Sequence, residues 1–418
     1  MIYKIIQFLK FLLLLNFSVF LSIAPYSKIL VKIVLCVGLF LGMLLIIARF
    51  IKIRIEKKEK HPLRVFLAGF LPRSSLTKTA LFFLFVSLCS VISSTDFFHS
   101  QSVFFERYIP YLFFFMFGYF LAKSRRNAGI LLFVFMINVA VLGWGAGVDH
   151  FRSPAARIFS SFGRPVNLSN YLVLAAPLSC VVFLFAKNPI LKLCGFITAV
   201  LSFSSLIWNG SRAAWLAVPI SSLSHCFLKN RKAALILLVV LLIVVYFLAP
   251  AYKNRAMTMF DVSSWNRVEL YRTAVRVFKA YPFFGSGLGT YEKVMYAKRF
   301  MPMNGYSFGR EHLHAHNTYL EMLSEMGIIG LTAFLWIFFL FFRKVFSNKS
   351  LWKNERNDKN VLLFGLSSSI MAILIFALAS TNITVGIQDS AVFWFLFGIA
   401  SSFLTPPKPV QFLVTTNC

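Results

Sequence analysis

Long apolar runs alternate with short polar segments from one end of the chain to the other. An α-helix needs about 20 apolar residues to cross a bilayer, and runs of this length recur throughout the sequence. The pattern predicts an all-α polytopic membrane protein with about twelve transmembrane helices. The predicted spans are residues 5–23, 29–48, 78–95, 108–122, 128–147, 167–186, 190–207, 213–228, 233–249, 328–342, 361–380 and 390–404.

Lysine and arginine mark one face of this arrangement. They cluster directly after the second, fourth, sixth, eighth and tenth predicted spans, and cytoplasmic loops of membrane proteins are enriched in both residues. Because these loops agree, that face and both termini are predicted to be cytoplasmic. The chain then divides into nine spans (1–249), a long, partly helical periplasmic loop (250–327), and three further spans with a cytoplasmic C-terminus (328–418).

Composition supports a membrane protein and excludes a soluble one, since 58% of residues are hydrophobic and only 14% are charged. The net charge is +29, from 43 Lys and Arg against 14 Asp and Glu. Part of this excess orients the chain, and the rest indicates anionic partners. The long loop alone has ten basic residues against four acids between Pro250 and Asn317. Two explanations stay open: a basic pocket for an anionic, lipid-linked substrate, and attraction of the loop to anionic lipid head groups.

The densest polar cluster stands directly before the tenth predicted span. It contains His312, His314 and His316, followed by Asn317. Behind it, apolar residues at helical spacing predict a short amphipathic helix at the membrane surface. The apolar stripe is Tyr319, Leu320, Met322, Leu323 and Met326, the polar positions are Thr318, Glu321, Ser324 and Glu325, and Gly327 and Gly330 follow. The cluster is therefore expected at the interface, within reach of a lipid head group.

Three roles are open for the histidines. They can be structural and hydrogen-bonded. They can also bind zinc, through His312 and His316 four residues apart or through all three on one face of a strand, with Glu311 or Glu321 as a further ligand. As a third role, a neutral imidazole near its pKa can take a proton from a hydroxyl nucleophile, and neighbouring arginines would keep it unprotonated.

Two arginines stand beside backbone breaks on the predicted periplasmic face. Arg212 follows Gly210 and Ser211, which interrupt the helix and leave N–H groups free for an anion. A lone interfacial arginine can instead extend its side chain to the membrane surface. Arg267 opens an amphipathic segment that closes at Tyr281-Pro-Phe-Phe-Gly-Ser-Gly-Leu-Gly289. These alternate glycines allow a sharp turn or a close approach to a ligand, but the strand and helix of a nucleotide-binding loop are missing.

Four short motifs occur in order between residues 160 and 330. They are Ser161-Phe-Gly-Arg-Pro-Val-Asn167 followed by Tyr171 and Pro177; Arg212-x3-Leu216; Asn266-Arg267 running to Pro282 and Gly285-Ser-Gly287; and His316-x10-Gly327, with Asn317 directly after the histidine. In these motifs the chain resembles the O-antigen ligase and polymerase superfamily of bacterial envelope glycosyltransferases, most strongly the O-antigen ligases. The N-terminal third resembles the family only as generic membrane helices.

The resemblance implies a metal-independent, cofactor-free enzyme of the bacterial inner membrane, with its active site facing the periplasm. Such an enzyme transfers polysaccharide from undecaprenyl diphosphate to a sugar hydroxyl of lipid A–core; its partners are these substrates and membrane lipids, and no nucleic acid. By carry-over, His316 activates the acceptor hydroxyl, and Arg212 and Arg267 hold the donor diphosphate. The supporting residues are Asn167, Arg310, His314, Asn317 and Gly327. The lipid carrier brings its own activated bond, so no nucleotide site is expected, and the sequence contains none.

Other functions share these features to different degrees. An O-antigen polymerase and a ligase that glycosylates proteins on Ser or Thr have the same motifs and differ in the acceptor. A transporter of lipid-linked sugars is a more distant alternative, because moving a diphosphate through the membrane favours charges at mid-depth. The predicted spans 128–147, 167–186, 233–249 and 361–380 contain no charged residue.

Overall fold

The computed structural model describes residues 2–57, 74–153, 165–246, 262–300, 313–352, 358–381 and 383–405. Within these ranges the chain is helical and forms no strand, which confirms the all-α fold class. The elements in order are α1 (Ile2–Ile23), α2 (Lys28–Lys57), α4 (Ser75–Ile92), α5 (Phe97–Val103), the π-helix η1 (Phe104–Tyr108), α6 (Ile109–Leu121), α7 (Arg125–Arg152), α8 (Pro165–Phe185), α9 (Pro189–Asn209), α10 (Arg212–Lys229), α11 (Arg231–Tyr246), α13 (Val262–Ala280), α14 (Tyr291–Ala297), α15 (Thr318–Ser347), α16 (Lys349–Trp352), α17 (Asp358–Phe376), the 3-10 helix η3 (Ala377–Ala379) and α18 (Ile387–Phe403).

Every one of the twelve predicted spans overlaps one of these helices. In the described residues, eight helices are long and apolar enough to cross a membrane: α1, α2, α4, α7, α8, α9, α15 and α17. The other four predicted spans coincide with α6, α10, α11 and α18, which have 13, 18, 16 and 17 residues. The chain is therefore a multi-pass membrane protein, while the count of twelve stays a prediction.

Helix α18 forms the core of the bundle, and every residue in the range 389–403 is buried. Glycines bring it into backbone contact with α6. A Cβ on Gly398 would overlap the Phe115 carbonyl, and a Cβ on Gly118 would overlap the Phe395 carbonyl. Packing between membrane helices depends on such close approach, because lipid tails are as apolar as the helices themselves. This close contact therefore fixes α6 against α18, and it also fixes η1 and α5, which directly precede α6.

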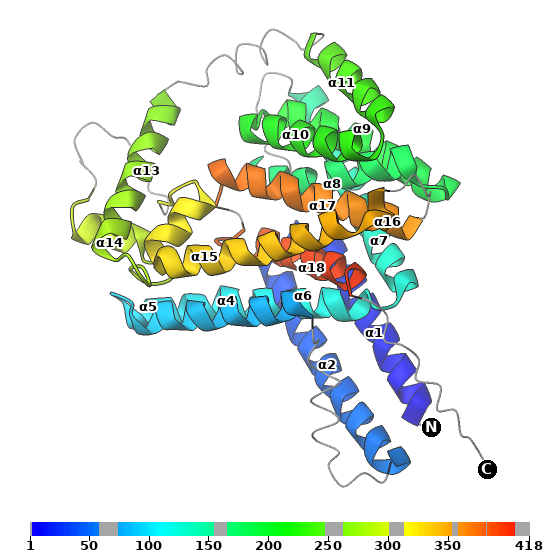
Figure 1. Cartoon of the computed structure of the whole chain (residues 1–418), viewed down its shortest axis with the longest axis horizontal. Coiled ribbons are helices and arrows are strands. Elements are labelled where there is room, and N and C mark those ends of the chain that lie inside the picture. The colour runs from blue at the N-terminus through cyan, green and yellow to red at the C-terminus, as the bar shows by residue number, and fades with distance from the viewer. Residues whose placement is uncertain are drawn as a thin grey trace.

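Several helix ends meet at the end of the bundle that carries α13 and α14 (Figure 1). The backbone N–H and hydroxyl of Thr318, at the start of α15, both donate to the Ser380 carbonyl beyond α17, at 3.0 and 2.7 Å. At the start of α6, the Tyr111 hydroxyl donates to the Thr384 carbonyl at 3.1 Å. All these ends belong to the face predicted to be periplasmic. The structure thus gathers them on one side, and the assignment of that side to the periplasm stays a prediction.

Candidate active site

The His-x10-Gly motif, residues 316–327, covers the start of α15, the longest helix of the site. The backbone leaves helical geometry at Gly327 (φ 66°, ψ −169°), which separates a first segment, 318–326, from the apolar segment 328–347. The prediction of a helix before the tenth span is confirmed, and its position at the membrane surface stays a prediction, but its polar side does not face water. Its polar side chains are at most 8% exposed: Thr318, Glu321, Ser324 and Glu325. They are buried because this side of the helix packs against protein.

The partner of this side is the glycine loop, residues 281–290. The break in α15 leaves backbone groups without helical partners, and the loop supplies them. The Gly287 N–H donates to the Glu325 carbonyl at 3.0 Å, and the Ile328 N–H donates to the Pro282 carbonyl at 2.9 Å. A Cβ on Gly285 (φ 74°) would overlap the Glu325 backbone. Of the two uses predicted for the glycines, the structure therefore shows the sharp turn. The close approach that it shows is to the backbone of α15.

The glycine loop is also fixed to α4 and α5. The Ser90 hydroxyl at the end of α4 donates to the same Glu325 carbonyl at 2.8 Å. The Ser100 hydroxyl of α5 donates to the Leu288 carbonyl at 3.0 Å. An ion pair of 2.8 Å joins Lys293 on α14 to Asp96 at the start of α5. Together these contacts make a rigid platform under the first segment of α15.

A non-helical segment without β-sheet pairing, residues 313–317 and called the histidine strand below, lies on this platform. Both oxygens of the buried Glu321 carboxylate bind it: Oε1 is 3.0 Å from His314 Nδ1, and Oε2 accepts the Ala315 N–H at 3.1 Å. Next comes His316, which is exposed and has a left-handed backbone (φ 49°). Asn317 then caps α15, because its side-chain oxygen accepts the N–H groups of residues 319 and 320 at 3.0 and 3.1 Å. Bonds on both sides therefore hold His316 in a conformation that non-glycine residues rarely adopt.

Helix α13 packs onto the histidine strand. Ala274 and Tyr291 form a small cluster with Ala315, the residue before the exposed histidine. Leu270 packs with Leu313 in a second cluster and accepts the Tyr291 hydroxyl through its carbonyl at 2.8 Å. The predicted diphosphate ligand Arg267 lies one turn before this contact, on the same helix, and is partly exposed.

The outward face of α13 is strongly basic. Its shallow groove is lined by Val268, Tyr271, Arg272, Val275, Arg276 and Lys279. The buried Glu269 holds two of these cations, with ion pairs of 3.3 Å to Arg272 and 2.8 Å to Arg276. Glu269 thus orders two positive charges on the outward face of α13, the helix that packs onto the histidine strand.

Arg212 lies on a different helix. The prediction of a break before it is confirmed, since α9 ends at Asn209, Gly210 caps it in the left-handed conformation (φ 66°), and α10 begins at Arg212. Ser211 makes no side-chain cap bond. In Figure 1 the N-terminal end of α10 points toward the end of the bundle that carries α13 and the start of α15. The arginine is partly exposed there.

The remaining predicted residues are less completely described. Asn167 lies in the first turn of α8, and its side chain is outside the described residues. Arg310 and His312 are outside them as well. In the described part of the chain, no three His, Cys, Asp or Glu side chains lie close enough together to hold a metal ion. The zinc set considered from the sequence included His312, so that alternative is not tested.

Three charged residues of the site were not predicted in the roles that the structure gives them: Glu321 was considered only as a zinc ligand, and Glu325 and Arg107 were not considered as site residues. Glu321 and Glu325 stand one helical turn apart among apolar residues, and a carboxylate inside an apolar helix is itself a functional signal. Glu325 accepts the Tyr291 N–H at 3.2 Å. The third is Arg107 in η1, a partly exposed residue whose positive charge acts on His314. A π-turn inside a longer helix is frequent at functional sites, but its sequence, Phe-Phe-Glu-Arg-Tyr, carries no clear signature.

The charges around His314 act in opposite directions. Burial lowers the pKa of this imidazole, whereas the charge and hydrogen bond of Glu321 and the charge of Glu325 raise it. Arg107 lowers it slightly. The carboxylates outweigh the other effects, so the pKa of His314 is raised above the ordinary value of a histidine.

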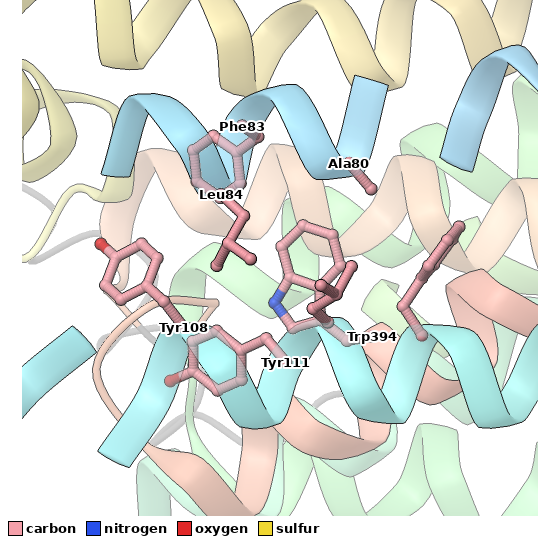
Figure 2. A pocket seen from close by; sticks show the side chains of 8 residues that line it. Ala80, Phe83, Leu84, Tyr108, Tyr111 and Trp394 are labelled. Atoms are coloured by element: carbon pink, nitrogen blue, oxygen red, sulfur yellow. The ribbon is translucent and has the colours of Figure 1, made fainter. Parts of the chain in front are cut away.

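A small cavity lies beneath this site, between α4, α6 and α18. It has a volume of about 20 Å³ and an aromatic lining that includes Phe83, Tyr108, Tyr111 and Trp394 (Figure 2). The Tyr108 hydroxyl donates to the Met326 sulfur at 3.6 Å, so this lining is tied to the first segment of α15. A cavity of this size has room for about one water molecule. It therefore has no room for a lipid tail or a sugar.

The fold and the site define a multi-pass membrane protein with one polar, basic centre where its helix ends meet. Residues 197–335 match the family model described as O-antigen ligase. This region runs from α9 into α15 and includes Arg212, Arg267, His316 and Gly327. A search of curated proteins found no match. This match supports membership of the chain in the O-antigen ligase and polymerase superfamily, whose members are glycosyltransferase-type enzymes for lipid-linked sugars.

Proposed function

We propose that the protein is an O-antigen ligase of the bacterial inner membrane, with its active site facing the periplasm. It transfers polysaccharide from undecaprenyl diphosphate to a sugar hydroxyl of lipid A–core. The observation that carries this proposal is the family match over residues 197–335, which includes the histidine strand together with the helix packed onto it. The basic face of α13 supports an anionic donor, since arginine binds phosphate through two parallel hydrogen bonds.

In this reaction His316 is the general base. Its exposed imidazole takes the proton of the acceptor hydroxyl, whose oxygen then attacks the anomeric carbon of the donor sugar. A new glycosidic bond forms as the bond from that carbon to the phosphate oxygen breaks. Undecaprenyl diphosphate leaves with the bonding electron pair, and the proton passes from His316 to water. The restrained backbone of the histidine suits this role, because a base must be held at a defined place relative to the nucleophile.

Arg212 and Arg267 hold the diphosphate and stabilise the charge that develops on it as the bond breaks. Arg212 is the first residue of α10, where the helix dipole also favours an anion, and Arg267 lies in the second turn of α13. Asn317 and Gly327 keep the histidine strand and the glycine loop in place. The donor is already activated, so the proposed reaction calls for no nucleotide, metal or cofactor.

Deletion of the gene, followed by electrophoresis of lipopolysaccharide, tests the proposal. A ligase mutant lacks the polysaccharide ladder and accumulates lipid-linked polymer, and the wild-type gene restores the ladder. Core carrying a single repeat would instead assign the protein as a polymerase. An unchanged ladder with unglycosylated envelope proteins would assign it as a protein ligase.

A further inference from the structure

The histidine strand contains a second imidazole with a carboxylate partner of its own. His314 and Glu321 are 3.0 Å apart, and the second oxygen of the carboxylate is occupied by the Ala315 N–H. The Glu321 side chain is only 4% exposed, whereas that of His314 is 29% exposed. A buried, doubly bonded carboxylate therefore orients an imidazole whose other edge reaches the surface of the site.

We propose that His314 is a third donor-binding residue, a cation that binds the diphosphate and that Glu321 holds in position. This inference rests on the proposed function, because it takes the lipid-linked diphosphate as the ligand. Nδ1 faces the carboxylate, so Nε2, on the opposite edge of the ring, is the atom offered to the ligand. Among the described residues, Nε2 has no hydrogen-bond partner. A protonated imidazole can donate from both nitrogens at once, one bond to Glu321 and one to a phosphate oxygen.

The surrounding charges favour the protonated form of this residue. Two carboxylates face it from α15, those of Glu321 and Glu325, and one cation, Arg107, faces it from η1. Both carboxylates are buried, with exposures of 3% and 8% for the whole residues. Two buried carboxylates one helical turn apart are costly to keep charged unless a cation compensates them or one of them is protonated. A positive His314 supplies that compensation and leaves an outward-facing N–H for the anion.

The two histidines then have different tasks in one reaction. His316, which is exposed to solvent, accepts the proton of the acceptor hydroxyl. His314 transfers no proton: it stays protonated while the diphosphate departs, and it stabilises the negative charge that the leaving group gains. Because its role requires a positive charge, donor binding should weaken as pH rises through the raised pKa of His314.

Binding of undecaprenyl diphosphate to the purified full-length protein in detergent tests this proposal directly, without the acceptor. The titration is repeated across the pH range in which histidine loses its charge. We expect the wild-type protein to lose affinity as pH rises, and His314→Gln to bind about 10- to 100-fold more weakly at low pH and without this pH dependence. Glu321→Gln should move the loss of affinity to lower pH, because the carboxylate no longer supports the cation.

A matched control is His99→Gln. His99 lies at the same end of the bundle, where its Nε2 is 3.0 Å from the Gly289 carbonyl, and it has no place in the proposed binding site. This variant should keep the wild-type pH profile even if the protein becomes less stable. Either of two results would show that the pair has only a structural role. In the first, Glu321→Gln weakens binding of the diphosphate by the same factor at every pH. In the second, His314→Gln binds it like the wild-type protein.

Transfer of polysaccharide to lipid A–core is measured on the same preparations. If donor binding depends on the pair as expected but no transfer occurs, the ligase assignment fails while the role of His314 stands. If transfer occurs and neither variant changes binding or its pH dependence, the role of His314 fails while the ligase assignment stands.

Discussion

The substitution Gly327→Ala tests how the glycine loop and α15 hold the site together. Gly327 has φ 66° and ψ −169°, a region of backbone space that is almost confined to glycine. A Cβ at this position would overlap the Phe283 carbonyl and lie 2.7 Å from the Phe284 nitrogen. These are backbone atoms, so no side chain can rotate away to make room. The loop and the helix must separate.

The cost follows from what the separation disturbs. Holding alanine in this conformation costs about 1–3 kcal/mol. Moving the loop also weakens two backbone hydrogen bonds, Gly287 to Glu325 and Ile328 to Pro282, at 3.0 and 2.9 Å. Each such bond contributes about 0.5–1.5 kcal/mol. We therefore expect a destabilisation of about 2–6 kcal/mol, centred on the platform under the histidine strand.

Thermal unfolding of the purified protein in detergent, followed by tryptophan fluorescence, measures this effect. Gly129→Ala is the control, because Gly129 lies in α7 and a Cβ there meets nothing within 4 Å. Alanine favours a helix by about 1 kcal/mol over glycine, so the control should melt at the wild-type temperature or slightly above it. Gly327→Ala should melt several degrees lower and lose transfer activity. If both variants melt alike and transfer normally, the close packing of loop and helix is not needed for stability or function.

Three further predictions address the site and its orientation. Lysine at Arg212 or Arg267 should impair transfer, because it keeps the charge but loses the two-bond fork, and alanine should nearly abolish transfer with normal membrane insertion. Full activity of Arg212→Ala would make that residue a membrane-surface anchor only. His316→Ala should reduce the rate of transfer by about 10²–10⁴-fold while donor binding survives. EDTA should leave the wild-type rate unchanged. A loss of activity in EDTA that added zinc restores would replace the general base with a metal site. A cysteine at position 255 should react with an impermeant reagent added from outside, whereas one at position 57 should not, and the reverse pattern would overturn the topology.

Much of the helical architecture was predictable from the sequence, and for a local reason. Within a bilayer the backbone must satisfy its own hydrogen bonds, so a long apolar run has few alternatives to a helix. The break at Gly210 was also a local property, since glycine adopts the left-handed conformation that ends a helix. The same holds for Asn317, a good helix cap placed directly before an apolar stripe.

The first segment of α15 shows where local reasoning stopped. Its alternation of apolar and polar residues indicates an amphipathic helix, but the periodicity does not say whether the polar side meets water or protein. Here it meets the glycine loop and the histidine strand, so Glu321 and Glu325 are buried. The predicted exposure was wrong because polar groups can be buried whenever backbone donors satisfy them.

The sequence by itself determined the class of the protein, the positions of most of its helices and the motif that contains His316, because apolar run length, helix breakers and caps act over a few residues. Only the tertiary structure decided the partners within the site. The bond from Ser90 to Glu325 joins residues 235 positions apart, and the charge of Arg107 acts on His314 from a helix about half the chain earlier in the sequence. Such contacts depend on how whole helices pack, and helix packing is set by the shapes of both surfaces, which the pattern of one segment does not contain.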